Sequence, residues 1–149
     1  MIQSAAMPSS DLEYALSLAD DADALTTARY RAADLAIETK VDLTPVTDAD
    51  RAVEKALRAR IARERGEAVA GEEFGVEEAD VRWWLDPIDG TKQYARGLPI
   101  WATLIALERE GTTVVGVVSA PALGHRWWAE RGEGAFVDVP AQVPESVKT

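Results

Sequence analysis

The stretch LDPIDGTKQY, residues 85–94, places Asp86 and Asp89 close together in a turn-like segment. An apolar run precedes Asp86, and Pro87 is expected to end the strand there because proline cannot donate a backbone hydrogen bond. The two carboxylates should therefore lie just past a strand end, in a stiffened turn. Such a pair is typical either of a metal site or of an Asx turn that caps a short helix. These residues alone leave the two interpretations level.

Groups next to these carboxylates favour the metal site. The carbonyl of Ile88 lies between the two aspartates in sequence, so three oxygens can converge on one or two Mg²⁺ ions. Gly90 lets the backbone pass close to a ligand and, together with Thr91, offers N–H groups to a phosphate. The hydroxyl of Thr91 can bind a water, although the same residue can also simply cap a helix.

Two further acidic motifs lie upstream. Thr47 and Asp50 have the spacing of a capping box, with aspartate in place of the usual glutamate, so a helix would be capped there whatever the function. Glu54, one turn further on, is expected to be a solvated helix residue. Gly71 and Glu72 follow a short apolar strand, and a glutamate at a strand end either points one carboxylate inward or belongs to a charged loop.

The amino-acid composition limits which partners and which metals the protein can bind. The chain has 149 residues with 16 basic and 26 acidic side chains, a formal net charge of -10, which argues against a nucleic-acid partner. Cysteine is absent and His125 is the single histidine, so a bound metal should be hard and oxygen-ligated: magnesium, manganese or calcium. No apolar run has the length of a membrane span, and the first residues lack a signal-peptide pattern, which predicts a cytoplasmic protein without a membrane partner.

Hydrophobic spacing predicts the elements that must position these residues. One helix is expected from Asp11 to about Ala33, and a second from near Thr47 to Gly66. Extended segments follow at residues 67–73, 81–86, 100–110, 112–122, 125–132 and 134–139. The last four are expected to form an antiparallel meander with glycine turns. The order predicts an α+β fold with both helices on one side of an antiparallel sheet. Residues 140–149 are expected to be a frayed tail.

The tryptophans are interpreted as core or interface residues rather than as a stacking platform for substrate. Side chains of adjacent strand residues point to opposite faces, so one tryptophan of each neighbouring pair should be exposed or lie at a subunit contact. The tryptophans are Trp83, Trp84, Trp101, Trp127 and Trp128.

The order of these motifs is more specific than any one of them. Thr-x-x-Asp at a helix start, then Gly-Glu-Glu, then Asp-Pro-Ile-Asp-Gly-Thr resembles the inositol-monophosphatase-like family of metal-dependent phosphatases. Within it, ETKVDLTPVTDAD, DGTK, RGLPIWATLIALE and VVGVVSAPALGHRWWA are similar to histidinol-phosphatases of the actinobacterial type. The resemblance spans most of the chain, and it implies the layered fold of that family.

The resemblance implies a role for each motif residue. Metal ligands would be the carboxylates of Glu72, Asp86 and Asp89 and the carbonyl of Ile88. Asp50 and Thr91 would orient and deprotonate the attacking water. The substrate phosphate would be held by Glu72, Asp89, Gly90, Thr91 and Lys92. Mg²⁺, or Mn²⁺ in its place, would lower the pKa of the water and screen the phosphate.

The implied reaction is hydrolysis of histidinol phosphate to histidinol and phosphate, in histidine biosynthesis. The alternatives are an inositol or sugar phosphate monophosphatase, and a non-catalytic remnant that binds a metal or a partner chain. The partner would be a small phosphorylated metabolite, and the full-length form would be a homodimer. Family members are much longer, so residues 1–149 are expected to be the N-terminal part of the domain, without the second α/β layer. Apolar strand surface should then be exposed, with poor stability and weak or absent activity.

Overall fold

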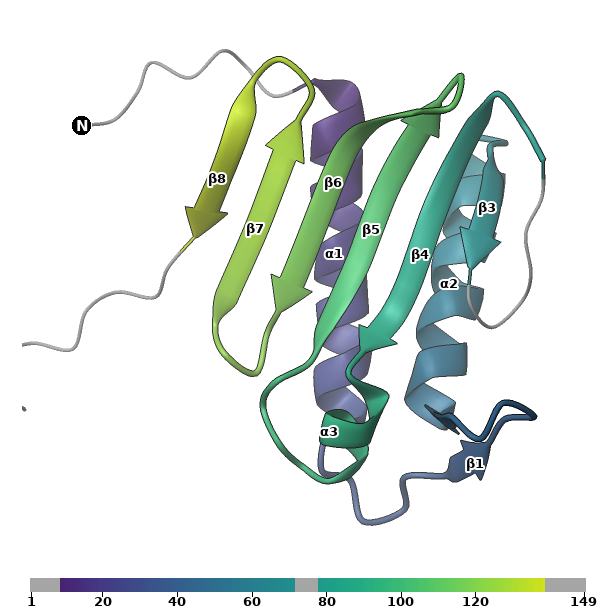
Figure 1. The fold of residues 1–149 in the computed structure, drawn as a ribbon, viewed down its shortest axis with the longest axis vertical. Coiled ribbons are helices and arrows are strands. Elements are labelled where there is room, and N and C mark those ends of the chain that lie inside the picture. Colours follow the sequence, from purple (N-terminus) through teal and green to yellow (C-terminus); the bar gives the residue numbers. More distant parts are fainter. Residues whose placement is uncertain (1–8, 72–77, 139–149) are drawn as a thin grey trace, which may run out of the picture.

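Two long helices cover one face of a six-stranded sheet (Figure 1). The computed structural model describes residues 9–71 and 78–138. The helices are α1 (Ser10–Arg29), α2 (Asp48–Glu64) and the short α3 (Thr91–Ala95). The sheet strands, in spatial order, are β3 (Ala68–Gly71), β4 (Val81–Asp89), β5 (Ala102–Arg109), β6 (Thr112–Ala120), β7 (His125–Glu130) and β8 (Gly134–Asp138). A separate antiparallel pair joins β1 (Ile37–Thr39) to β2 (Pro45–Thr47).

Local signals set the ends of the helices. The hydroxyl of Ser9 accepts a hydrogen bond from the Leu12 amide and caps α1. The helix ends at Arg29, earlier than the predicted Ala33, because Tyr30 adopts an extended backbone and donates its hydroxyl to the Gly97 carbonyl. The capping box predicted at the start of α2 is present. The C-terminus of α2 is followed by Gly66 at φ 62°, a left-handed conformation that suits glycine.

The sheet confirms the α+β prediction with one difference. Strands β4 to β8 form the expected antiparallel meander, but β3 runs parallel to β4, so the sheet is mixed. In this register Val69 lies opposite Trp83, and both side chains are buried against the helices. The parallel pairing therefore adds one more strand to the face that α1 and α2 cover.

The main core lies between this face and the two long helices. Its largest members are Trp83 from β4, Leu57 and Ile61 from α2, and Leu107 from β5. The predicted alternation of neighbouring tryptophans is confirmed, because Trp83 is fully buried whereas Trp84 is 40% exposed on the opposite face. Both helices lie behind the sheet in Figure 1, and none covers the front face among the described residues.

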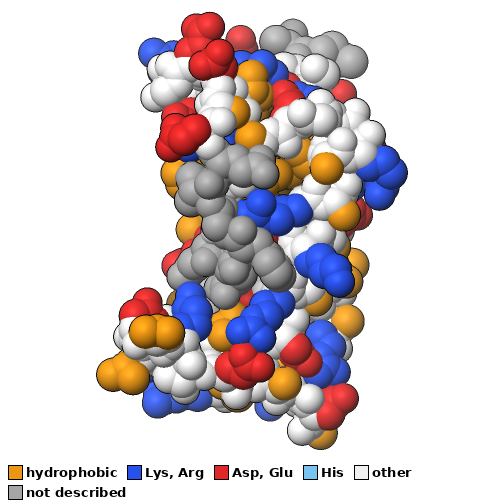
Figure 2. Space-filling view, turned by 90° about the vertical axis from the view of Figure 1, so that its right-hand side faces the viewer, with side chains coloured by type: hydrophobic (Ala, Val, Ile, Leu, Met, Phe, Trp, Pro, Cys, Tyr) orange, Lys and Arg blue, Asp and Glu red, His pale blue; other side chains and the backbone are white. Residues whose placement is uncertain are grey.

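Charges are mixed over the surface. Figure 2 shows the side of the molecule that carries β3 and α2, where acidic and basic side chains alternate with apolar ones over the described part. Within residues 9–71 and 78–138, no helix combines the length and the apolar character needed to cross a membrane. The tail predicted at residues 140–149 lies outside the described residues.

Candidate active site

A β-bulge brings the two aspartates of the DPID motif to one face. Asp86 lies opposite Leu104 on β5, and Asp89 lies opposite Ala102, so β4 advances one residue more than its partner. Without that extra residue, side chains three positions apart would point to opposite faces. The strand continues through Pro87 to Asp89, contrary to the prediction that it ends at the proline. The bulge explains this, because a bulged position does not need the missing N–H.

A small aromatic core fixes the end of β4. The side chain of Ile88 is buried against Tyr94, Trp101 and Ala49, apart from the main core. The Tyr94 and Trp101 rings meet edge to face with centroids 4.9 Å apart, and the Tyr94 hydroxyl donates to the Thr26 carbonyl at 2.8 Å. With its side chain anchored in this way, the Ile88 backbone is held between the two carboxylates.

Tyr94 itself is a structural donor rather than an acid or base. Burial, followed by the negative charges of Asp50 and Asp48, raises the pKa of its hydroxyl well above the usual value. The phenol therefore stays protonated and keeps its bond to the Thr26 carbonyl. It links α3, which begins just after the motif, to α1.

The predicted catalytic pair lies together. The Thr91 hydroxyl is 3.2 Å from Oδ1 of Asp50, although the residues are 41 positions apart in sequence. The same hydroxyl is 2.9 Å from the Ile88 carbonyl. A hydroxyl has one hydrogen, so Thr91 donates to one of these acceptors at a time. The contact joins the start of α2 to the DPIDGT motif.

Asp50 is held from both sides. Its Oδ2 accepts hydrogen bonds from the Thr47 amide at 2.8 Å and the Thr47 hydroxyl at 2.6 Å, while the Asp50 amide approaches that hydroxyl at 3.2 Å. The side chain is 2% exposed. The capping interpretation is thus confirmed, and Oδ1 is left to face Thr91.

A hollow of about 320 Å³ opens beside these groups. Most of the predicted site residues line it, together with the end of the β1–β2 loop and the first residue of β2. The lining residues are Leu43, Thr44, Pro45, Asp86, Ile88, Asp89, Gly90, Thr91, Lys92 and Gln93. Gly90 has φ 87°, and an added Cβ would come within 2.9 Å of the Ile100 carbonyl, so only glycine fits this turn. Carboxylate and carbonyl oxygens on one wall are the ligand types that Mg²⁺ prefers.

Glu72 lies outside the described residues, so the predicted ligand set is seen only in part. Within residues 9–71 and 78–138, no three acidic, histidine or cysteine side chains converge closely enough to hold a metal. The strand that leads to Glu72 is described, however. The β3 strand ends at Gly71, directly before it, and follows β4 in parallel up to Leu85, the residue before Asp86.

Glu54 is buried, contrary to the prediction that it is solvated. Its side chain is 0% exposed and pairs with Arg58, whose Nε lies 2.9 Å from Oε2. Arg58 also donates to the Val69 carbonyl of β3 at 3.2 Å. A Cβ added at Gly71 would overlap the Glu54 carboxylate, so the glycine makes room for it. The contact between Glu54 and Gly71 could not be predicted from local sequence, because the two residues belong to different elements.

Thr103 is a further supporting residue that the sequence did not indicate. Its buried hydroxyl donates to the Pro87 carbonyl at 2.8 Å, from β5 into the bulge of β4. The bond ties β5 to the bulge of β4 and stiffens the segment between Asp86 and Ile88.

Comparison with known proteins agrees with this geometry. Residues 7–148 match the model of the inositol monophosphatase family. The histidinol-phosphatase of Mycobacterium tuberculosis is 57% identical over 141 residues, covering 93% of this chain and 54% of the relative. The histidinol-phosphatase of Streptomyces coelicolor is 56% identical over 132 residues, covering 85% and 50%. An IMPase structure from Thermotoga maritima superimposes with a TM-score of 0.83 at 31% identity, over 87% of this chain and 52% of the other. The chain spans about half the length of the curated relatives it matches.

Proposed function

The chain belongs to the inositol monophosphatase family, and we propose that it supplies the catalytic wall of a metal-dependent phosphomonoesterase whose substrate is histidinol phosphate. The observation that carries the proposal is the 3.2 Å contact between Thr91 and Asp50 beside the Asp86–Asp89 bulge. It joins two segments, the start of α2 and the DPIDGT motif, that a structural turn or helix cap alone would not need to bring together.

The metal would be Mg²⁺, with Mn²⁺ able to replace it. Asp86, Asp89 and the Ile88 carbonyl would hold it on this wall, and Glu72 would complete their set. When bound, the metal lowers the pKa of a water and neutralises charge on the phosphate and the leaving oxygen. The donors of Asp86, Ile88 and Asp89 are all oxygens, and these three residues line one hollow, so their chemistry fits a hard divalent ion.

The residues of the chain would move the proton and hold the phosphate. When Thr91 donates its hydrogen to Asp50, its lone pairs are left to accept a hydrogen from the attacking water. That water hydrogen would pass towards Asp50 as the water oxygen bonds to phosphorus. The phosphorus–oxygen ester bond would break, and the departing oxygen would take a proton from solvent to give the alcohol. The Gly90 and Thr91 amides, with Lys92 and Asp89 at the same rim, are proposed to orient the phosphate.

The substrate assignment rests on the two histidinol-phosphatases that are more than half identical to this chain. Inositol or sugar phosphates are the second substrate class, since the family model is that of inositol monophosphatases. A cytoplasmic location and a homodimer of the full-length form stay predictions.

Metal binding by the chain itself is the first test. Titration with Mn²⁺, followed by electron paramagnetic resonance, should show binding that Asp89→Asn weakens by about tenfold or more. The matched control is Asp138→Asn, the same change on exposed β8 at the far edge of the sheet. Equal Mn²⁺ affinity in both variants would remove Asp89 from the ligand set.

Turnover is the second test. A joined protein is made by placing, after this chain, the half of the M. tuberculosis relative that the match leaves out. It should release phosphate from histidinol phosphate with Mg²⁺, faster than from inositol 1-phosphate, and Asp89→Asn should abolish the release. Faster hydrolysis of inositol 1-phosphate would favour the second substrate class. Metal binding without any turnover would favour a non-catalytic role.

A further inference from the structure

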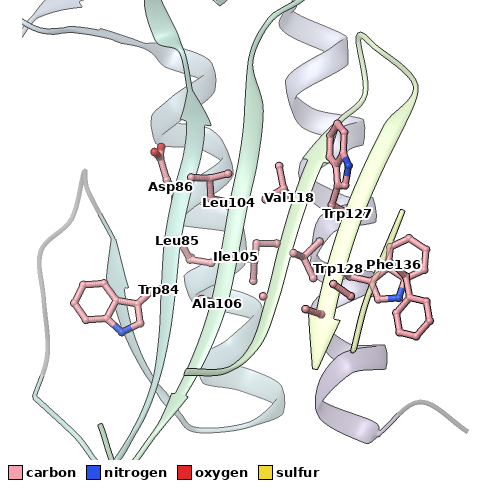
Figure 3. Close-up of a pocket in the computed structure, with 14 residues that line it drawn as sticks. Trp84, Leu85, Asp86, Leu104, Ile105, Ala106, Val118, Trp127, Trp128 and Phe136 are labelled. Carbon is pink, nitrogen blue, oxygen red and sulfur yellow. The ribbon is translucent and has the colours of Figure 1, made fainter. Parts of the chain in front are cut away.

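A large hollow lies on the sheet face that points away from α1 and α2. Its volume is about 570 Å³, and Figure 3 shows Trp84 at one side of it and Trp127 at the other, with Leu104 and Val118 between them. The side chains around it are almost all apolar. The second α/β layer that the family resemblance implies would cover this face, so the hollow points to no new ligand.

A smaller hollow of a different kind lies beside α3. Its volume is about 360 Å³, within the range of small-molecule sites, and it opens between the end of α3 and the connection from α1 to β1, which run side by side in Figure 1. Two arginines line it, Arg31 from that connection and Arg96 from the end of α3, and no acidic residue of the described part does. The other walls are small or apolar: Ala32, Ala33, Leu35, Ile37, Ala95 and Gly97.

The protein does not neutralise these two arginines. Among the described residues, the side chains of Arg31 and Arg96 form no hydrogen bond or ion pair. The acid nearest to Arg31 in sequence, Asp34, pairs instead with Arg29 at 2.8 Å. In a chain with a net charge of -10, two guanidinium groups at one hollow are thus left to bind an anion from outside.

The backbone at Arg31 is strained in order to hold this side chain. Tyr30 is extended, Arg31 has φ 62°, and the Ala32 amide donates to the Arg29 carbonyl at 3.1 Å, which describes a type II turn. The third position of such a turn favours glycine, because other side chains crowd the backbone at positive φ. The Arg31 side chain lies across Gly97, where an added Cβ would come within 3.4 Å of its Cγ and Nε. The chain thus keeps an arginine where glycine is less strained, and a glycine where the arginine needs room.

We propose that this hollow, the arginine pocket, binds a small anion that carries a phosphate group. Guanidinium N–H groups match the oxygens of a phosphate, and two of them balance its two negative charges. The apolar walls can contact the body of an organic phosphate. A bound anion would join the end of α1 to the end of α3, the helix that begins at Thr91. The arginine pocket shares no residue with the hollow of the candidate active site, so the inference goes beyond the proposed function.

Calorimetric titration of the metal-free chain tests the arginine pocket. Phenylphosphonate is the probe, because a phosphatase cannot hydrolyse its phosphorus–carbon bond. Arg31→Gly and Arg96→Gln should each weaken its binding by about tenfold or more. Glycine suits the type II turn, so the melting temperature of Arg31→Gly should not fall, which separates lost binding from lost folding.

Arg131→Gln is the matched control. It removes an exposed arginine that also forms no ion pair among the described residues, from the β7–β8 turn at the opposite end of the sheet from α3 (Figure 1). Its affinity for phenylphosphonate should equal that of the unchanged chain. Benzoate, which has the same ring but a single charge, should bind more weakly than phenylphosphonate.

The outcomes separate the possible occupants. Tighter binding of phenylphosphonate than of inorganic phosphate would identify an organic phosphate, and equal affinities would identify free phosphate; both results support the pocket. Benzoate that binds as tightly as phenylphosphonate would overturn the phosphate assignment. Absence of binding, or binding that Arg31→Gly and Arg96→Gln leave unchanged, overturns the inference. So does binding that only Lys92→Gln weakens, since the anion would then lie in the candidate active site. No metal or turnover enters this test, so a failure of the proposed phosphatase activity is seen separately.

Discussion

Asp50 serves two elements with one carboxylate. Oδ2 accepts hydrogen bonds from the Thr47 amide and the Thr47 hydroxyl, and Oδ1 faces the Thr91 hydroxyl. The cap holds the carboxylate in a single orientation. The entropy cost of ordering the Asp50 side chain is therefore met on folding and not during the reaction. Stability and the proposed catalysis are therefore separable at this residue by the choice of substitution.

Asp50→Asn should keep the fold and lose the chemistry. Asparagine retains an oxygen for the Thr47 amide but has no negative charge to draw a proton through Thr91. We expect phosphate release by the joined protein to fall by about 100-fold or more, with less than about 1 kcal/mol lost from the free energy of unfolding. Phosphate assays and urea denaturation measure the two effects. Thr47→Ser, which keeps the hydroxyl, is the control; a normal rate for Asp50→Asn would exclude Asp50 as the base.

At the scale of elements, contacts between α2 and β3 hold the end of β3 at Gly71, the residue before Glu72 in sequence. The Glu54 carboxylate fills the space beside Gly71, and Arg58 ties Glu54 to the Val69 carbonyl. Helix and strand are thus joined through a charge pair, with Glu54 fully buried, in addition to the apolar contacts of Val69. Such a pair tolerates little change in shape, because its charges must keep their partners.

Gly71→Ala should therefore be costly. The new methyl group would overlap the Glu54 carboxylate and displace either it or the end of β3. We expect a loss of about 1–3 kcal/mol in the free energy of unfolding, measured by urea denaturation of the chain. Gly116→Ala is the matched control, since its methyl group would enter open space. Equal stabilities for the two variants would contradict the close approach of Glu54 and Gly71.

The elements themselves could largely be predicted from the sequence, but their exact register could not. Helix periodicity, the Thr47–Asp50 box and the turn glycines are local signals, and each was confirmed. The bulge at Pro87 is not local, because one extra residue is defined only against β5. The parallel direction of β3 and the burial of Glu54 likewise depend on contacts between distant segments. Local sequence thus indicated candidate site residues, but it did not indicate how Asp86 and Asp89 come to lie on one face.

The ends of α1, α2 and β5 are joined by one acidic residue. Asp11 accepts hydrogen bonds from Arg109 at 3.0 Å and also pairs with Arg65. Burial by itself would raise the pKa of Asp11, but the bonds from Arg65 and Arg109 outweigh it and lower the pKa below its ordinary value of 3.8. Because the folded pKa is depressed, the stabilisation is present above pH 3.8 and is lost as the pH falls through the lower folded value.

Asp11→Asn should accordingly destabilise the chain at neutral pH and matter less in acid. We expect a loss of about 1–2 kcal/mol near pH 6 that shrinks as the pH falls below 3.8. Urea denaturation of both proteins across this range measures the difference. Glu13→Gln, an exposed change in the same helical turn, should have little effect. A difference that stays constant with pH would show that the charge of Asp11 contributes nothing.

At the scale of the whole molecule, one face of the sheet is covered and the other is not, within the described residues. The covered face holds the main core, whereas the opposite face carries Trp84, Trp127 and the hollow between them. The exposed apolar area gives the isolated chain a tendency to associate through this face. The same area is expected to become an interior surface in the joined protein.

A charge placed on this face should have opposite effects in the two contexts. Val118→Lys adds a cation at the centre of the hollow, so the chain alone should bind less of the dye ANS and remain monomeric at higher concentration. In the joined protein the same lysine would be buried without a partner, and we expect a loss of about 3 kcal/mol or more in the free energy of unfolding. Light scattering and urea denaturation measure the two effects. Val41→Lys, a fully exposed control, should change neither property. If Val118→Lys left the joined protein as stable as this control, the face would not be an interior surface, because a buried lysine cannot be neutral in free energy.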